Sequence, residues 1–237
     1  HRQNPLILND GNAGGSNDMA YLKPSRSWSS AIGWKLLIPD NHISLLIRLF
    51  NTELTHLPIS NNYSPVINNI SYDDKRKLNE NGRARTYGVE FIADKNISDN
   101  TYLNLNASFF QTKFESENGT SLNSQFNFGH VFNLNVSQKI TNRKENIWAC
   151  NIAGHFRGGA YSNGKVRPIE AQVQLGDYWR IDFRMEHRWK SSVLTLDIQN
   201  VLNRQNDAYI YFDEWTKTEK LKKQLGLIPV LSYKRHF

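Results

Sequence analysis

Apolar and polar residues alternate with a period of two along much of the chain. The clearest stretch runs from Trp179 to Trp189, where the odd positions are apolar or aromatic apart from His187. A helix would scatter these side chains around its whole circumference, whereas a strand places them all on one face. The even positions are all charged and form a ladder: Arg180, Asp182, Arg184, Glu186 and Arg188. The stretch therefore predicts a β-strand with one apolar and one ionised face.

The length of this strand separates two kinds of sheet. Strands of soluble proteins are commonly about 5–6 residues long, while a tilted membrane strand needs about 9–11. The distance from Trp179 to Trp189 is ~34 Å along a strand. A tilt of about 40° reduces this to a height of ~26 Å, close to the apolar band of an outer-membrane barrel. The span favours a transmembrane strand over a half-buried strand of a soluble sheet.

The same period recurs along the chain and predicts about nine strands. They fall at 27–37, 42–51, 85–94, 101–111, 130–140, 147–158, 177–190, 193–203 and 225–237. The connections alternate between short turns and long polar loops. The turns are 38–41, 96–99, 140–145 and 190–192, and the loops are 53–82, 115–126, 159–176 and 204–222.

Regular alternation of short and long connections is typical of an up-and-down sheet whose two ends differ. Outer-membrane barrels have short periplasmic turns and longer extracellular loops, whereas the Greek-key connections of soluble sandwiches cross between sheets. We therefore predict an all-β fold, an antiparallel up-and-down transmembrane barrel, with 1–25 as an extracellular loop and 26–237 as strands. Two alternatives stay open: a porin-like channel and a soluble β-sandwich binding module.

Composition narrows the function classes. The 237 residues carry a formal charge of +7, but the sequence has no Lys/Arg-rich run or recognition-helix pattern, so we expect no nucleic-acid partner. No stretch approaches the ~18 consecutive apolar residues of a transmembrane helix. Cys150 is the one cysteine and cannot form an internal disulfide. Asp182 and Glu186 would lie ~13 Å apart on a strand, too far for a glycosidase pair. We therefore expect no enzyme activity, no metal site and no cofactor.

Four stretches resemble the C-terminal barrel portion of TonB-dependent outer-membrane receptors, particularly those of Bacteroidetes type. They are GRARTYGVEF (82–91), DYWRIDFRMEHRW (177–189), LDIQNVLNRQN (196–206) and QLGLIPVLSYKRHF (224–237). The resemblance implies a barrel of about 22 strands closed by an N-terminal plug. Such a receptor imports a scarce ligand of the siderophore, cobalamin or glycan class, with energy from the TonB complex.

About nine strands cannot close such a barrel, and neither a plug nor a TonB box is recognisable. We therefore interpret the chain as a C-terminal fragment, or the product of a truncated reading frame, of a receptor in the outer membrane of a Gram-negative bacterium. The expected partners are the lipid bilayer, lipopolysaccharide, the barrel-insertion machinery, a plug domain, TonB and an unknown small-molecule ligand. The basic stretch 217–224 is read either as a contact for anionic lipopolysaccharide or ligand, or as a solvated loop.

The pattern also suggests roles for individual residues. The C-terminal strand resembles a barrel-insertion signal, carried by Leu231, Tyr233 and Phe237. The aromatic residues Trp28, Trp148, Trp179, Trp189 and Tyr233 are assigned to interface girdles, with packing in a soluble core as the alternative. The charge ladder is interpreted either as a lumenal strip that lines the transport path or contacts the plug, or as alternating-sign packing of a polar lumen wall. The loop 53–82 is the candidate for ligand contact through Tyr63, Tyr72, Asp73 and Arg76.

Overall fold

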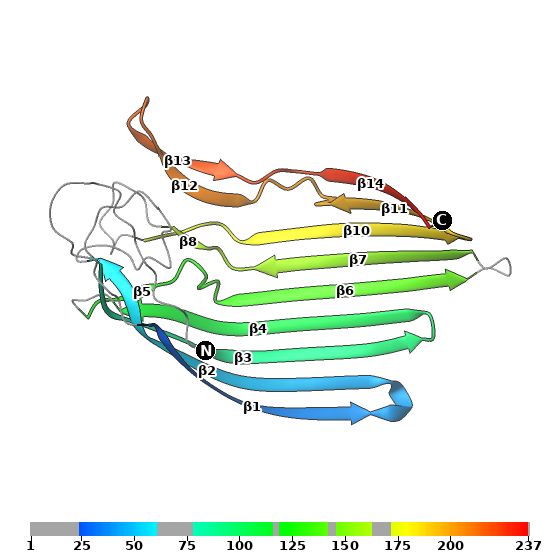
Figure 1. Cartoon of the computed structure of the whole chain (residues 1–237), viewed down its shortest axis with the longest axis horizontal. Helices are drawn as coiled ribbons and strands as arrows, with labels where there is room; N and C mark the ends of the chain where they lie inside the picture. Colours follow the sequence, from blue (N-terminus) through cyan, green and yellow to red (C-terminus); the bar gives the residue numbers. More distant parts are fainter. Residues whose placement is uncertain (1–23, 61–77, 116–118, 142–145, 163–171, 237) are drawn as a thin grey trace.

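The chain forms one large antiparallel sheet in a computed structural model, which describes residues 24–60, 78–115, 119–141, 146–162 and 172–236. Figure 1 shows nine long strands side by side, each beside its neighbour in chain order. They are β1 (Arg26–Ile38), β2 (Ile43–Ser60), β3 (Leu78–Ser98), β4 (Thr101–Glu115), β6 (His130–Thr141), β7 (Ile147–Arg157), β10 (Tyr178–Trp189), β11 (Ser192–Gln199) and β14 (Ile228–Arg235). This is the predicted all-β, antiparallel, up-and-down arrangement.

The two ends of the sheet differ as expected. At one end, on the right of Figure 1, short turns join β1 to β2, β3 to β4 and β10 to β11, and the adjoining ends of β6 and β7 lie there too. One of these turns contains a short 3₁₀ helix, η1 (Pro39–Asn41). The strand ends that lead into the longer connections lie at the opposite end. We call these the short-turn end and the long-loop end.

Strand register aligns the apolar side chains into continuous rows across the sheet. One row passes through the paired residues Trp34, Ile47, Phe91, Ala107, Phe132, Phe156 and Trp179, each opposite the next. Because side chains alternate between faces, a register shift of one residue at any pair would break the row. The rows define an apolar face, and the charge ladder of β10 lies on the opposite, polar face.

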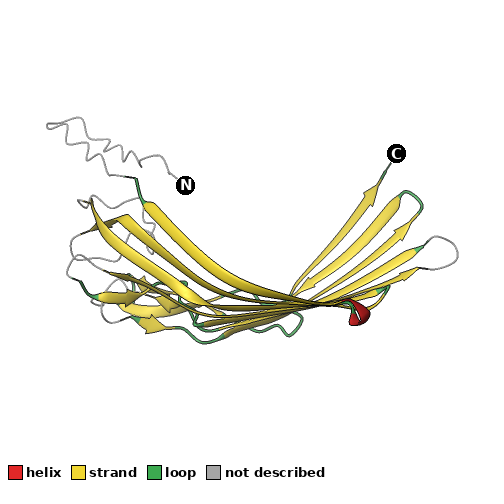
Figure 2. Cartoon of the chain, turned by 90° about the horizontal axis from the view of Figure 1, so that it is seen from below, coloured by secondary structure: helices red, strands yellow, loops and turns green. Residues whose placement is uncertain are grey.

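The sheet is a single curved layer (Figure 2). Trp34 is 58% exposed and Ile152 is 52% exposed, so large apolar side chains stand open on the apolar face. No second layer covers this face within the described part of the chain. Burying such a face against the same chain is what a soluble sandwich requires, and the structure does not provide it.

The few buried apolar residues lie toward the long-loop end. Leu57, Phe114, Leu122 and Leu175 are each less than 10% exposed. They lie near the ends of β2 and β4, in β5 (Ser121–Asn123), which pairs with β4, and just after β9 (Val173–Gln174). β9 pairs in turn with β8 (Tyr161–Ser162). Within the described residues, buried apolar side chains therefore pack near the loops and not along the middle of the sheet.

Two predicted loops were too long. The expected loop 53–82 loses its ends to strands, since β2 continues to Ser60 and β3 begins at Leu78. The expected loop 204–222 contains a hairpin of β12 (Asp207–Asp213) and β13 (Thr218–Lys223). In β12 the apolar alternation through Ala208, Ile210 and Phe212 is short, and β13 is mostly charged, so neither strand stands out from a polar loop. Tyr63, Tyr72, Asp73 and Arg76 lie outside the described residues, as does Phe237.

Candidate functional site

The charge ladder of β10 is internally paired on the polar face. Asp182 Oδ2 lies 2.7 Å from Arg180 Nη2, and Glu186 forms an ion pair with Arg188. Arg184 Nη1 lies 3.2 Å from Asp197 Oδ1 on β11. The arginine side chains are between 33% and 59% exposed, and pairs this open are worth only about 0–1 kcal/mol each. The ladder therefore gives the polar face a charged but locally balanced strip, and its role in transport remains a prediction.

Neutral amides continue the polar face on the neighbouring strands. Asn135 Oδ1 accepts a hydrogen bond from Asn151 Nδ2 on β7. His155 Nδ1 lies 2.8 Å from Asn133 Oδ1 on β6, and its Nε2 lies 3.7 Å from Asp182 Oδ2 on β10. Side chains linked by hydrogen bonds and ion pairs across β6, β7, β10 and β11 form a hydrophilic wall that a polar solute or a polar protein surface can contact.

Aromatic rings gather on the apolar face at the short-turn end. His187 stacks on Trp148 with ring centroids 4.0 Å apart and on Trp189 at 4.8 Å. Tyr233 of β14 follows, 6.2 Å from Trp189. The stack explains why His187 occupies an otherwise apolar position, since an imidazole ring packs as a flat surface between two indoles. Sequence reasoning left His187 out of the girdle because its residue type is polar.

The other predicted aromatic positions lie toward the long-loop end. Trp28 pairs with Glu53 on β2, and Trp179 pairs with Phe156 on β7. The two sets of rings therefore stand at two heights of the sheet, which is the arrangement that a membrane-interface role predicts. Leu231 and Tyr233 lie on the edge strand β14, at 69% and 58% exposure. Their role in a signal for barrel insertion stays a prediction.

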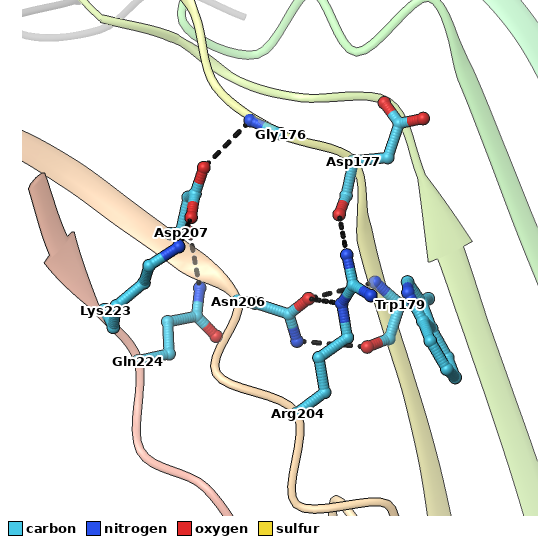
Figure 3. Close-up of polar contacts among 8 residues, drawn as sticks. All are labelled: Gly176, Asp177, Trp179, Arg204, Asn206, Asp207, Lys223 and Gln224. Atoms are coloured by element: carbon cyan, nitrogen blue, oxygen red, sulfur yellow. Dashed lines mark hydrogen bonds and ion pairs between the residues drawn. The ribbon is translucent and has the colours of Figure 1, made fainter.

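A polar cluster at the long-loop end fastens the segment after β11 to β10 (Figure 3). The Asn206 side chain accepts a hydrogen bond from the Trp179 N–H and donates one to the Trp179 carbonyl. Arg204 Nε donates to Asn206 Oδ1 at 3.1 Å, and its guanidinium lies over the Trp179 ring. Asn206 is only 3% exposed. Arg204 and Asn206 belong to the stretch LDIQNVLNRQN (196–206). The pattern of the sequence did not indicate that this stretch is bound to the start of β10.

Asp207 extends the cluster to the hairpin. Its Oδ2 accepts a hydrogen bond from the Gly176 N–H at 2.9 Å, and its other oxygen pairs with Lys223 of β13 (Figure 3). The hydrogen bond from Lys223 is the main cause that lowers the pKa of Asp207, with Gly176 adding to it. One ionised carboxylate therefore fixes the base of the hairpin to the segment that precedes β10.

The hairpin itself is nearly neutral in its local charge. Lys217 pairs with Glu214 at 3.2 Å, Lys220 pairs with Asp213, and Lys223 pairs with Asp207. Within the described residues, Lys222 is the one lysine of the segment without an ion pair. Internal pairing favours the solvated-loop reading of 217–224 over a basic contact. The indole of Trp215, at the hairpin tip, is 96% exposed.

Hollows open on the polar face and among the loops. One, of about 890 Å³, lies at the short-turn end and is bordered by Tyr102, Asn151 and Glu186. Two smaller ones, of about 300 and 410 Å³, lie at the long-loop end and share Arg157. Within the described residues, no group of His, Cys, Asp and Glu could hold a metal ion, and no helix is long and apolar enough to cross a membrane.

Comparison with known proteins agrees with this architecture. The model of the family "TonB dependent receptor-like, beta-barrel" matches residues 3–203. No curated protein sequence matches the chain. Solved structures share the fold, with the chain spanning about a third of each relative or less.

Three of these structures are ferric-chelate receptors by name. The ferric-catecholate import receptor Fiu of Escherichia coli K12 is 17% identical, with a TM-score of 0.65, over 100% of this chain and 32% of that one. The ferric yersiniabactin uptake receptor FyuA of Yersinia pestis is 14% identical, with a TM-score of 0.66, over 91% and 31%. The ferripyoverdine receptor of Pseudomonas aeruginosa is 12% identical, with a TM-score of 0.62, over 90% and 27%.

The open sheet, with its apolar face uncovered and its polar face hydrogen-bonded, defines a portion of an outer-membrane β-barrel wall. The chain belongs to the TonB-dependent receptor β-barrel family. Members of this family are outer-membrane receptors and transporters of Gram-negative bacteria, and they are not enzymes.

Proposed function

We propose that this chain forms part of the barrel wall, and some ligand-contacting extracellular loops, of an outer-membrane receptor that imports a scarce ligand. The observation that carries the proposal is the uninterrupted apolar face, uncovered in the described residues, backed by a hydrophilic wall. Such a sheet suits a boundary between hydrocarbon and a wet interior. Family membership favours an active receptor over a porin-like channel.

The ligand class is the finer part of the proposal. Siderophores, cobalamin and glycans are the candidates, and the names of the similar structures favour a ferric chelate. The ligand would arrive at the long-loop end, where Tyr63, Tyr72, Asp73 and Arg76 are proposed to contact it. The charge ladder and the amide wall would face a plug domain, which TonB would move.

Other partners follow from the same placement. The apolar face would contact lipid between two aromatic girdles, with Trp148 and Trp189 at the periplasmic interface and Trp28 and Trp179 at the extracellular one. Lipopolysaccharide would surround the long-loop end. The barrel-insertion machinery would bind the C-terminal strand through Leu231, Tyr233 and Phe237.

Uptake of radiolabelled iron chelates by a deletion strain that expresses the complete receptor of which this chain is proposed to form part tests the proposal. We expect uptake of at least one ferric chelate, and we expect its loss in a strain that lacks TonB or after addition of a proton uncoupler. Iron uptake that is insensitive to both treatments would indicate a channel instead. Recovery of the protein outside the outer-membrane fraction would overturn both interpretations.

A further inference from the structure

The two hollows at the long-loop end share one positively charged residue, Arg157. Arg157 is the last residue of β7 and lies on the polar face, in register with Tyr178 at the start of β10. It borders both the hollow of about 300 Å³ and the one of about 410 Å³. Each has the size of a pocket for a small molecule.

Two aromatic rings hold the Arg157 guanidinium in place. Its Cζ lies 4.1 Å from the centroid of the Phe128 ring and 4.7 Å from that of Tyr178. Contacts of this kind are worth about 0.5–2 kcal/mol each. Because the rings come from the loop before β6 and from β10, they fix the guanidinium plane from two separate elements.

The clamp leaves most of the hydrogen-bonding capacity of Arg157 available. A guanidinium has five N–H donors, and within the described residues Arg157 makes one hydrogen bond, of 3.4 Å, to the Gly158 carbonyl. No carboxylate pairs with it there. A fixed guanidinium with free N–H groups is well suited to bidentate contact with an oxyanion.

The hollow of about 300 Å³, which we call the lower hollow, has further positively charged groups around it. Arg180 and His155 border it together with Arg157. Asp182 is the carboxylate beside them, and it is already engaged by Arg180 at 2.7 Å. The Nε atom of Arg180 is buried and has no partner within the described residues. Two guanidiniums against one carboxylate leave an excess of positive charge.

The hollow of about 410 Å³, which we call the upper hollow, is bordered by several aromatic side chains. Phe126, Phe128, Tyr161 and Tyr209 border it, and Phe126 packs edge-on against Phe128. Rings above and cations below would accept a molecule that joins a flat or apolar group to an oxyanion.

We infer that these two hollows form one binding site for a small molecule bearing a carboxylate or similar oxyanion on an aromatic or apolar group, with Arg157 as its central contact. The inference rests on the proposed function, because it places the site where an incoming ligand passes from the loops to the polar face. It adds a contact on the wall itself to the contacts proposed for the loop 53–82.

Benzoate and the uncharged, nearly isosteric benzamide are the probes for this site. Saturation-transfer NMR titrations use the complete receptor that contains this chain, purified from outer membranes in detergent micelles. We expect benzoate to bind wild-type protein about tenfold more tightly than benzamide. Arg157→Gln should remove this preference. Lys222→Gln is the matched control, because it removes one charge at the same end of the sheet, and it should change benzoate affinity less than about twofold.

Equal binding of benzoate and benzamide, or unchanged benzoate binding in Arg157→Gln, would overturn the inference. Absence of benzoate binding to wild-type protein would also overturn it, and would be expected if a carboxylate of another polypeptide segment filled the hollow. Circular dichroism of the strands checks folding. If Arg157→Gln does not fold, Arg180→Gln provides the same comparison from the lower hollow.

The binding and uptake experiments can fail separately. Charge-selective benzoate binding without TonB-dependent uptake would overturn the proposed function and leave the site in place. Uptake without charge-selective binding would do the reverse.

Discussion

The side chain of Asn206 pairs with the backbone of Trp179 as a neighbouring strand would. It accepts a hydrogen bond from the Trp179 N–H at 3.2 Å and donates one to the Trp179 carbonyl at 3.0 Å. β11 ends at Gln199, and just beyond it the Val201 N–H donates a hydrogen bond to the Ile181 carbonyl of β10. Asn206 therefore satisfies the groups of β10 that lie beyond the reach of β11, and in doing so it anchors the hairpin.

Replacement of Asn206 by alanine should loosen this anchor. Two backbone groups of Trp179 would lose their partners at a buried position, at a cost of about 1–3 kcal/mol. We expect faster hydrogen exchange at the Trp179 amide and faster proteolysis of 204–227. Lys222→Ala, at an exposed hairpin position, is the control and should leave both rates unchanged. Equal exchange rates in Asn206→Ala and wild type would contradict the anchoring role.

Two glycines of the sheet should respond oppositely to alanine. A Cβ at Gly88 would lie 2.3 Å from the Phe109 carbonyl oxygen, whereas one at Gly154 meets no atom within 4 Å. Gly88→Ala must push β3 from β4 and should destabilise the fold by about 1–3 kcal/mol. Gly154→Ala should stabilise it by about 0.5–1 kcal/mol, since glycine weakens a strand. Urea unfolding in micelles compares the two, and similar midpoints would refute the packing argument.

Much of the wall was predictable because it obeys one rule. Residues such as Trp34, Ile47 and Phe91 alternate with polar neighbours, and a strand sorts the two sets to opposite faces. Loop lengths then fixed the order of the strands. The register that aligns these three residues in one row follows once each apolar set must share a face.

The candidate site was not predictable in the same way. The guanidinium of Arg157 is held by the rings of Phe128 and Tyr178. Both residues are distant from Arg157 in the sequence, and no periodic pattern links them to it. Asn206 looks like an ordinary loop residue until Trp179 is placed beside it. The hairpin escaped notice because the apolar alternation of β12 is only three residues long, Ala208, Ile210 and Phe212, and β13 opposite it is mostly charged. Contacts of this kind depend on the fold, and composition carries no signal of them.

Acid should release the hairpin tip only at very low pH. The pKa of Asp213 is lowered from 3.8 to about 2, chiefly by the hydrogen bond from Lys220 and also by the Trp215 N–H. Because the pKa of the folded state is the lower one, the stabilisation is complete above about pH 4. It is lost as the pH falls through about 2. Carbon NMR of the Asp213 carboxyl measures this pKa.

Lys220→Gln should move the pKa of Asp213 upward toward its ordinary value, though not fully, because the backbone N–H groups of Trp215 and Thr216 still donate to it. Lys222→Gln removes the same charge from a residue that does not pair with Asp213 and should leave its pKa in place. A titration of Asp213 near its ordinary value in the wild-type protein would show that the ion pair does not form.

Site-directed spin labelling on adjacent residues tests the central claim most directly, that one face meets hydrocarbon and the other meets water. The single native cysteine permits a clean background in Cys150→Ser. Single labels are then placed at Ile152→Cys on the apolar face and at Ala153→Cys on the polar face of β7. Collisions with oxygen and with a water-soluble nickel chelate are measured in bilayers. The account predicts that oxygen dominates at 152 and the nickel chelate at 153, and nickel-dominated collisions at 152 would contradict it.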